Sequence, residues 1–222
     1  AIMFPFLLAV FYIAFLSGDK FWLSIKKALK ETWPYFGLVI IYGILRLTVL
    51  NFQNTTNFYT VSNVYSESLM VRLYTFGGVL VEYARLLFVP VGLHMERSAV
   101  VYTSLFQWPV WGVFLALAGL VAWLAYLYKK GNNDQINQRS NISSFRIWFF
   151  GIAWFFIALA PVSGITPINA ILYEHWLYLP LIGPWFVVAF YLVRLLNLPK
   201  LRNKNFLLVP CFLLLIAYLS FF

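Results

Sequence analysis

The sequence is divided into long apolar stretches, and their length is the feature that most restricts its fold. An α-helix rises about 1.5 Å per residue, so about 20 apolar residues match the roughly 30 Å hydrocarbon core of a bilayer. Shorter stretches also fit when the side chains at their ends reach the head groups. We therefore predict membrane-spanning helices over residues 1–16, 34–50, 108–128, 147–163, 177–196 and 206–222.

Composition indicates the same class of protein. Of the 222 residues, 63% are hydrophobic and only 10% are charged, which is more apolar surface than a soluble domain of this size buries. No glycine–serine linker, heptad run or short internal repeat divides the chain. We expect an all-α, polytopic transmembrane helical bundle of about six spans, forming a single membrane domain over residues 1–222. Both ends lie inside apolar runs, so we interpret the chain as an internal piece of a longer protein.

Basic residues gather in three connections between the apolar stretches, at 17–33, 129–146 and 194–205. Lysine and arginine mark the cytoplasmic loops of membrane proteins, so these connections are predicted to lie on the cytoplasmic side. The net charge of +9 therefore reflects membrane orientation and predicts no nucleic-acid partner. Segment 17–35 has the pattern of an interfacial amphipathic helix, and an ordinary cytoplasmic connector resting on anionic head groups is the simpler alternative.

Residues 51–107 must begin and end on the outer side if the basic connections are cytoplasmic. Within them, 71–90 is apolar enough to be mistaken for a further span, but an extra crossing would place the later basic connections outside. We therefore predict that 51–107 is an outer-face re-entrant or interfacial region, in which 71–106 forms a re-entrant hairpin or interfacial helices with a turn near Pro90. Non-helical backbone at that depth is tolerated where it lines a wet cavity, so a cavity is expected there.

The outer side is predicted to hold both histidines together with acids and arginines. His94, Glu96 and Arg97 form one group, and Glu174 and His175 stand side by side between two apolar runs. Charge beside a bilayer is usually tolerated for a functional reason, although a solvated loop is the structural alternative for the first group. Neighbouring helical residues cannot share one face, so the side chains of Glu174 and His175 should point in different directions.

Two more arginines are candidates for binding an anion. Arg46 lies in the outer half of the 34–50 span, one turn after Tyr42, where it either reaches outward or faces an anionic partner inside the bundle. Arg85 is three residues after Glu82, so a simple ion pair is the structural alternative. No Gly-rich phosphate loop, GxSxG or HExxH motif or zinc-spaced cluster occurs, and two distant histidines with one cysteine predict no metal site.

Three pieces of the sequence occur in a recognisable order. The piece "YGILR" (42–46) ends a span, "YARLLFVPVGLHMER" (83–97) follows on the outer face, and "NAILYEHWLYLPLIG" (169–183) opens another span. Together they resemble the GT-C class of polytopic glycosyltransferases. Within that class, the chain is most similar to the branch of bacterial membrane proteins and animal protein O-mannosyltransferases with C-terminal tetratricopeptide repeats. The resemblance covers only the later spans of the GT-C fold.

This resemblance implies transfer of a sugar from a polyprenyl-phosphate-linked donor to a protein or glycan acceptor, at the outer face of a bacterial inner membrane. The family's catalytic acid lies in the first outer loop, which nothing in this sequence matches, so it is expected outside this chain. Many members have arginine where Trp176 stands. For the donor phosphate, we predict the forked guanidinium groups of Arg46, Arg85 and Arg97.

A second set of side chains is predicted to bind or orient the substrate: Tyr42, His94, Glu96, Glu174 and His175. Glu174 or His175 could hold sugar hydroxyls, orient an arginine, or help to bind a divalent cation if the enzyme uses one. No other cofactor is predicted. An arginine beside the leaving phosphate would stabilise the transition state, because that phosphate gains negative charge while the sugar ring becomes positive.

Two other functions stay open at the level of the sequence. A non-enzymatic transporter or flippase would line its path with outer-face charges, although its usual inverted repeats and broken midplane helices are not evident in the sequence. An O-antigen-ligase-like enzyme also acts on a lipid-linked sugar with outer-face arginine and histidine. That class lacks the Glu-His-Trp-Leu-Tyr-Leu-Pro pattern found at 174–180.

Overall fold

The computed structural model describes residues 2–17, 21–49, 62–89, 91–92, 94, 96–134, 143–168 and 170–196. Helices dominate this part of the chain, which confirms the all-α class. Within it, three helices are long and apolar enough to cross a membrane: Trp108–Gly131, Ser144–Val162 and Glu174–Leu195. They coincide with three of the predicted spans, 108–128, 147–163 and 177–196. The total of six is not confirmed, because the helical segment Phe4–Leu16 is shorter and 206–222 lies outside the described residues.

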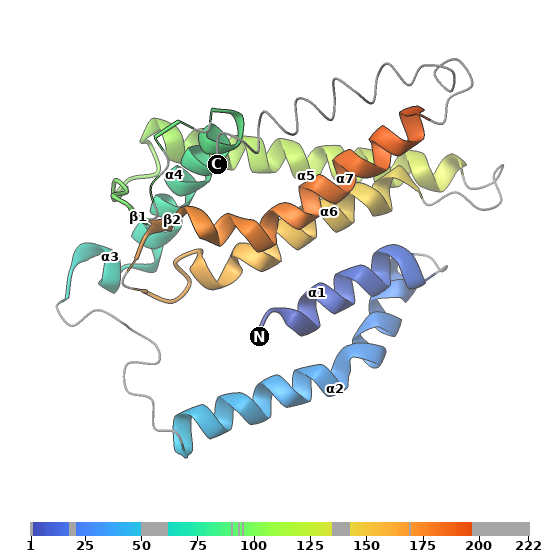
Figure 1. Cartoon of the computed structure of the whole chain (residues 1–222), viewed down its shortest axis with the longest axis horizontal. Helices are drawn as coiled ribbons and strands as arrows, with labels where there is room; N and C mark the ends of the chain where they lie inside the picture. Colours follow the sequence, from blue (N-terminus) through green and yellow to red (C-terminus); the bar gives the residue numbers. More distant parts are fainter. Residues whose placement is uncertain are drawn as a thin grey trace.

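The three long helices form the frame of the molecule. They are α5 (Trp108–Asp134), α6 (Ser144–Leu159) and α7 (Tyr178–Leu196), which lie side by side and alternate in direction (Figure 1). The end of α5, the start of α6 and the end of α7 therefore meet at one end of the bundle, on the right of Figure 1. Basic residues from each helix lie at that end: Lys129, Lys130, Arg146 and Arg194. The clustering of lysine and arginine in the connections predicts that these basic ends lie on the same side of the bundle. That this side faces the cytoplasm stays a prediction.

Helices α6 and α7 touch at two glycines. Gly151 and Gly183 face each other so closely that a Cβ added to Gly183 would lie 2.4 Å from the carbonyl oxygen of Gly151. Small residues allow membrane helices to approach in this way. Beside this contact, the rings of Phe15, Phe150 and Phe186 pack edge to face with centroids 5.0 to 5.4 Å apart. These rings join the N-terminal helices to the α6–α7 pair.

The N-terminal part is a helical hairpin of α1 (Phe4–Phe11), the π-helical turn η1 (Tyr12–Leu16) and α2 (Phe21–Thr48). We predicted an interfacial helix or cytoplasmic connector over 17–35, followed by a span over 34–50. That division is wrong, because α2 is one continuous helix with Pro34 inside it. Proline removes one backbone donor and crowds the preceding turn, which bends a helix without necessarily ending it. Figure 1 shows the bend, and α2 is not among the helices long and apolar enough to span.

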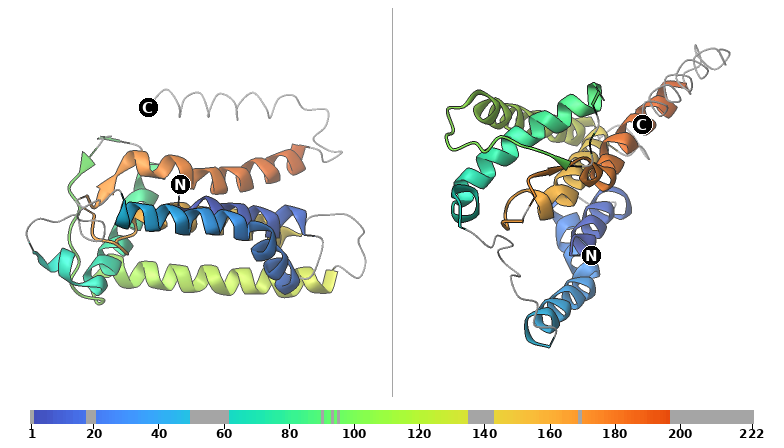
Figure 2. Two further views of the ribbon diagram at one scale, coloured as in Figure 1. Left: turned by 90° about the horizontal axis from the view of Figure 1, so that it is seen from below. Right: turned by 60° about the vertical axis from the view of Figure 1, so that its left-hand side comes forward.

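A helix runs across the other end of the bundle. It is α4 (Leu69–Phe88), preceded by the short α3 (Val64–Glu67), and Figure 2 shows that its direction crosses those of α5, α6 and α7. Apolar segment 71–90 is therefore not a fourth parallel helix. Between α4 and α5 the described residues form strand β1 (Glu96–Arg97) and no helix, so the second limb of the predicted hairpin is not helical in this part of the chain. The predicted turn residue, Pro90, lies outside the described residues.

Strand β1 pairs antiparallel with β2 (Leu172–Tyr173), with Glu96 opposite Tyr173 and Arg97 opposite Leu172. β2 follows α6 through the 3₁₀ turn η2 (Ala160–Val162) and leads through η3 (Glu174–Leu177) into α7. A buried apolar cluster packs these segments against α4. Its members are Val79, Tyr83, Leu86, Leu159, Leu172 and Leu177. The two-residue ribbon thus holds the outer-face candidates of both halves of the chain together.

Arg72 anchors α4 from inside. Its side chain is buried, and its guanidinium donates from Nε to the carbonyl of Gly164 at 2.6 Å and from Nη1 to those of Ser66 at 2.8 Å and Tyr65 at 3.3 Å. Burying a charge is tolerated when hydrogen bonds replace its water. Gly164 has φ +81°, where a side chain would be strained, and an added Cβ would lie 3.1 Å from the Cβ of Arg72.

Candidate functional site: a polar cluster beside an apolar groove

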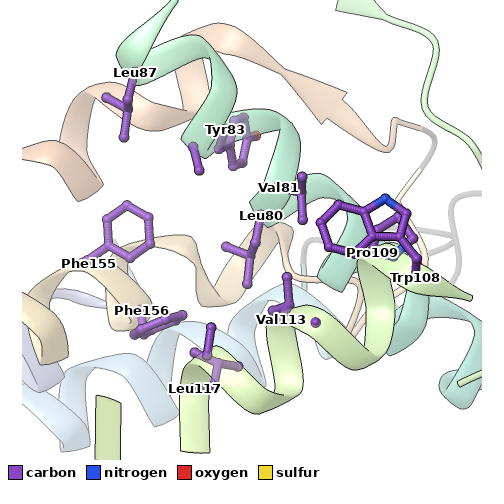
Figure 3. Close-up of a pocket in the computed structure, with 13 residues that line it drawn as sticks. Leu80, Val81, Tyr83, Leu87, Trp108, Pro109, Val113, Leu117, Phe155 and Phe156 are labelled. Atoms are coloured by element: carbon purple, nitrogen blue, oxygen red, sulfur yellow. The ribbon is translucent and has the colours of Figure 1, made fainter. Parts of the chain in front are cut away.

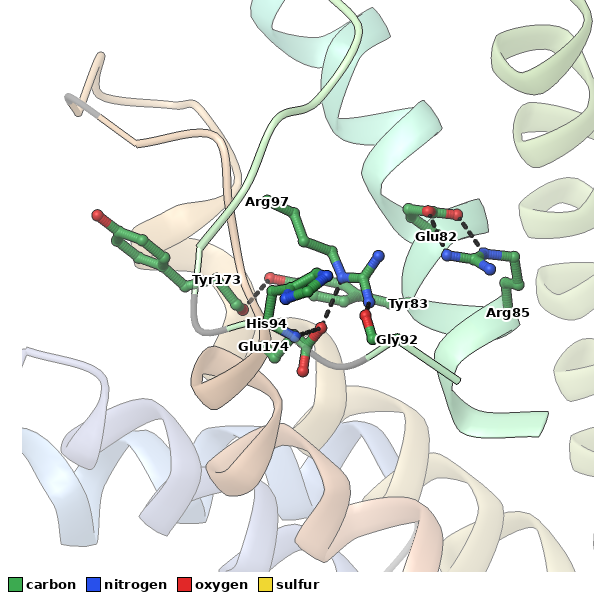
Figure 4. A network of polar contacts seen from close by, with 8 residues as sticks. All are labelled: Glu82, Tyr83, Arg85, Gly92, His94, Arg97, Tyr173 and Glu174. Atoms are coloured by element: carbon green, nitrogen blue, oxygen red, sulfur yellow. Dashed lines mark hydrogen bonds and ion pairs between the residues drawn. The ribbon is translucent and has the colours of Figure 1, made fainter. Parts of the chain in front are cut away.

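Glu174 is the centre of the polar cluster at the end of the bundle crossed by α4 (Figure 4). Its Oε1 accepts a hydrogen bond of 2.5 Å from Arg97 Nε and one of 2.9 Å from the backbone N–H of His94. Arg97 also donates from Nη2 to the carbonyl of Gly92, whose φ of +66° favours glycine. The Arg97 and Glu174 side chains are only 14% and 18% exposed, so this ion pair is better shielded than a surface pair.

A second ion pair stands next to the first. Arg85 donates from Nε and Nη2 to the two carboxylate oxygens of Glu82, both at 2.8 Å, as the three-residue spacing suggested. The hydrogen bond from Arg85 lowers the pKa of Glu82, and the positive charge of Arg97 adds to the same effect. Two arginines and two glutamates from distant parts of the sequence therefore form one electrostatic cluster.

Tyr83 fixes the ribbon onto α4. Its side chain is 1% exposed, and its hydroxyl donates a hydrogen bond of 3.0 Å to the carbonyl of Tyr173. Burial raises the pKa of Tyr83 well above its ordinary value, so the hydroxyl stays a donor at any physiological pH. Tyr83 was not predicted from the sequence, because a tyrosine on an apolar helix carries no signal for a partner 90 residues away.

Replacing Tyr83 with phenylalanine should lower the free energy of unfolding by about 1 kcal/mol, because the Tyr173 carbonyl loses its donor while the ring still fills its site. Denaturant unfolding of the purified protein in detergent measures the change. Tyr126→Phe on α5 is the matched control, since Tyr126 is 58% exposed. A Tyr83→Phe protein as stable as this control would show that the hydrogen bond contributes nothing.

Glu174 and His175 point in different directions, as their adjacency predicts. While Glu174 faces Arg97, the exposed ring of His175 stacks on Tyr173 with centroids 5.2 Å apart and an interplanar angle of 24°. Trp176 packs edge-on against the same Tyr173 ring at 4.8 Å. His175 therefore belongs to a small aromatic group beside the ion pairs, and not to the ion pairs themselves.

An apolar groove of about 430 Å³ lies between α4, α5 and α6 beside this cluster (Figure 3). Trp108, Ala84 and Ala116 are exposed at its rim. A smaller pocket of about 240 Å³ adjoins it, because Val81 and Pro109 line both. The smaller pocket is more polar, and its lining includes Glu82, Ser98 and Tyr102. An amphiphile could therefore place an apolar tail in the groove and a polar group towards the cluster.

Two predicted site residues, Tyr42 and Arg46, lie away from this cluster. Both belong to the second half of α2. The helix α2 packs on α1 and η1, and Figure 1 shows its C-terminal end apart from β1 and β2. Tyr42 is 43% exposed and Arg46 is partly buried. Glu96 reaches the site through the backbone of β1, and its side chain lies outside the described residues. Of the three predicted phosphate-binding arginines, the cluster contains Arg85 and Arg97.

The described residues contain no group of three histidine, cysteine or acidic side chains that could hold a metal ion. The cluster itself offers guanidinium donors, two carboxylates that hold them in place, and an apolar groove. Comparison of the chain with models of protein families, with curated proteins and with solved structures gave no match.

Proposed function

We propose that the protein is a membrane glycosyltransferase that transfers a sugar from a polyprenyl-phosphate-linked donor to a protein or glycan acceptor. The observation that carries the proposal is that the apolar groove adjoins a more polar pocket lined by Glu82 and Ser98. Glu82 is the ion-pair partner of Arg85, and Ser98 follows Arg97 in the chain. The resemblance of the motifs around both arginines and around Glu174 to GT-C enzymes supports the same donor. The active face is proposed to be the outer one.

The groove suits a polyisoprenoid chain. Its lining is aliphatic and aromatic, with Leu80, Val113 and Phe156 on three different helices. Its volume is within the range of roughly 300–1,000 Å³ typical of ligand sites. Because α5 is a candidate membrane span, a lipid tail could enter the groove sideways from the bilayer without crossing water.

The arginines suit the donor phosphate. Arg97 binds Glu174 and Gly92 through Nε and Nη2, and Arg85 binds Glu82 through Nε and Nη2. Within the described part of the chain, Nη1 of each guanidinium is left for a further acceptor. The N–H groups of Nη1 can donate charge-assisted hydrogen bonds to phosphate oxygens. When the bond between sugar and phosphate breaks, negative charge grows on the phosphate, so fixed guanidinium groups lower the energy of the transition state.

The two carboxylates act as positioning groups in this proposal. Glu174 fixes the direction of Arg97, and Glu82 does the same for Arg85. Since each acid already holds a cation, neither is assigned as the base that activates the acceptor. The resemblance places that base in the first outer loop of the GT-C fold, which the sequence does not match.

Filling the groove should block the donor. Ala116 lines the groove, whereas Ala118 is exposed two residues further along α5 and does not line it. Residues two apart point to different sides of a helix, so Ala118→Trp is a matched control. We expect Ala116→Trp to weaken binding of polyprenyl phosphate to the nanodisc-reconstituted protein by about ten-fold or more, equivalent to about 1.4 kcal/mol. Titration with a fluorescent polyprenyl phosphate measures this.

Equal binding by both tryptophan variants and the unmodified protein would remove the groove from the proposal. Catalysis is tested separately, by incubating proteoliposomes with a radiolabelled polyprenyl-phosphate sugar. Release of sugar or its transfer to an acceptor supports a transferase. Movement of the intact lipid-linked sugar between leaflets without cleavage would instead support a flippase.

A further inference from the structure

We propose that the first half of α2, residues 21–33, is a membrane-surface element that selects anionic lipid head groups. This segment lies on a face of the molecule remote from the polar cluster, so its role does not depend on sugar transfer. Its inner side is a stripe of small residues spaced four apart, Ser24, Ala28 and Thr32, with exposed fractions of 0%, 0% and 1%.

That inner stripe packs tightly on the N-terminal hairpin. Ala28 belongs to a buried cluster with Ala9 and Ile13, and Ser17 donates a hydrogen bond of 2.7 Å to the hydroxyl of Ser24. The rotation of the helix is therefore fixed. Its other side faces outward, and nothing in the described residues covers the large apolar side chains there.

The outward side is divided into two strips. Successive helical residues are about 100° apart, so Leu29, Trp22 and Trp33 fall within about 40° of one another. These three side chains are 52%, 70% and 66% exposed. Exposed Lys26 and Lys30 occupy the next part of the circumference. Leu23, which is 47% exposed, then exposed Lys27 and exposed Glu31 follow them towards the inner stripe. An apolar strip beside a basic strip is the pattern of a helix lying in a membrane interface.

The direction of this segment agrees with that location. Because α2 bends near Pro34, its first half runs across the direction of α5, α6 and α7 (Figure 2). If those three helices span the bilayer, this half lies along the membrane plane. It also lies at the basic end of the bundle, where α5 and α7 terminate (Figure 1). The tryptophans then sit at the level of the acyl-chain boundary and the lysines at the head groups.

The apolar and basic strips together indicate which kind of partner binds residues 21–33. An acidic protein or a nucleic acid would neutralise Lys26 and Lys30 but leave Trp22 and Trp33 against water. A zwitterionic surface would take up the tryptophans but leave the lysines without counter-charge. An anionic bilayer satisfies both strips at once, since its head groups and acyl chains are adjacent. We therefore assign anionic phospholipid as the partner of residues 21–33.

The test measures which lipid lies beside Trp22. The whole protein carries Cys211→Ser and Trp22→Cys, is labelled with a fluorophore at position 22, and is reconstituted in mixtures of phosphatidylglycerol and phosphatidylcholine. Either lipid is brominated in its acyl chains, so the ratio of quenching gives the local selectivity. A lysine near an anionic surface contributes about 1 kcal/mol, so Lys26→Gln and Lys30→Gln should each lower the selectivity about five-fold.

The charge-preserving pair Lys26→Arg and Lys30→Arg is the control and should keep the selectivity. Both lysines are exposed, so none of these changes should affect folding. Equal quenching by the two brominated lipids in the Trp22→Cys protein would overturn the proposal. So would an unchanged selectivity in the double glutamine variant, or a label at position 22 that neither lipid quenches.

Discussion

Replacing Glu174 with alanine should lower the free energy of unfolding by about 2–4 kcal/mol. The change leaves the mostly buried guanidinium of Arg97 with the Gly92 carbonyl as its remaining partner among the described residues. Removing one member of a shielded pair costs more than the pair itself contributes, because the remaining charge stays desolvated. The backbone N–H of His94 loses its acceptor as well. Denaturant unfolding in detergent, followed by tryptophan fluorescence, measures the effect.

Two further variants, Glu82→Ala and Arg97→Ala, serve as controls for the effect of Glu174→Ala. Glu82→Ala removes the exposed partner of Arg85 and should cost much less, since water replaces the lost contact. In a double-mutant cycle, adding Arg97→Ala to Glu174→Ala should recover part of the lost stability, because the stranded charge is gone. If Glu174→Ala is no more costly than Glu82→Ala, Glu174 does not hold the ribbon and α7 together.

A methyl group at Gly183 should destabilise the bundle by about 1–3 kcal/mol, near the upper end of that range. The added Cβ would lie 2.4 Å from the carbonyl oxygen of Gly151 and 2.9 Å from the Cβ of Trp154. The first contact is with backbone, which cannot rotate away, so α6 and α7 must move apart. Their separation would also disturb the hydrogen bond of 2.9 Å from the Trp154 indole to the Leu179 carbonyl.

The matched control for this change is Gly119→Ala on α5, where an added Cβ meets nothing within 4 Å. Alanine has a higher helix propensity than glycine, so this control should leave stability unchanged or raise it slightly. Thermal unfolding of both variants in the same detergent compares them directly. Equal midpoints for Gly183→Ala and Gly119→Ala would contradict the close α6–α7 crossing.

The sequence predicted the elements whose signal is local. Length and hydropathy identified the three long helices, and the lysine and arginine clusters predicted that their basic ends lie together. The charge argument also predicted that 71–90 is not a further span, and α4 does lie across the bundle (Figure 2). The bend at Pro34 was misjudged as a boundary, because a proline in a sequence does not distinguish a kinked helix from two helices.

The site could be predicted only in part. Glu174, Arg97 and Arg85 were identified because charge beside apolar runs is unusual. The pairing of Arg97 with Glu174 was not predictable, since it depends on the β1–β2 register, which places Arg97 opposite Leu172, and on Tyr83 fixing Tyr173. The apolar groove is likewise formed by three helices and leaves no motif in any of them. Arg46 is a charged residue beside an apolar run, as Arg97 is, so the sequence alone does not distinguish the two. The path of α2 places Arg46 away from the cluster that contains Arg97.

The most direct measurement of the central claim is photo-crosslinking with a polyprenyl phosphate that carries a diazirine on its isoprenoid chain. Peptide mapping of the reconstituted protein should place the adducts on α4 and α5, around Leu80, Ala84 and Leu117. Unlabelled polyprenyl phosphate should compete, and Arg85→Gln with Arg97→Gln should weaken the labelling. Adducts spread over α2 and the outer side of α7, unaffected by competitor or by the arginine changes, would contradict a lipid-phosphate site in this groove.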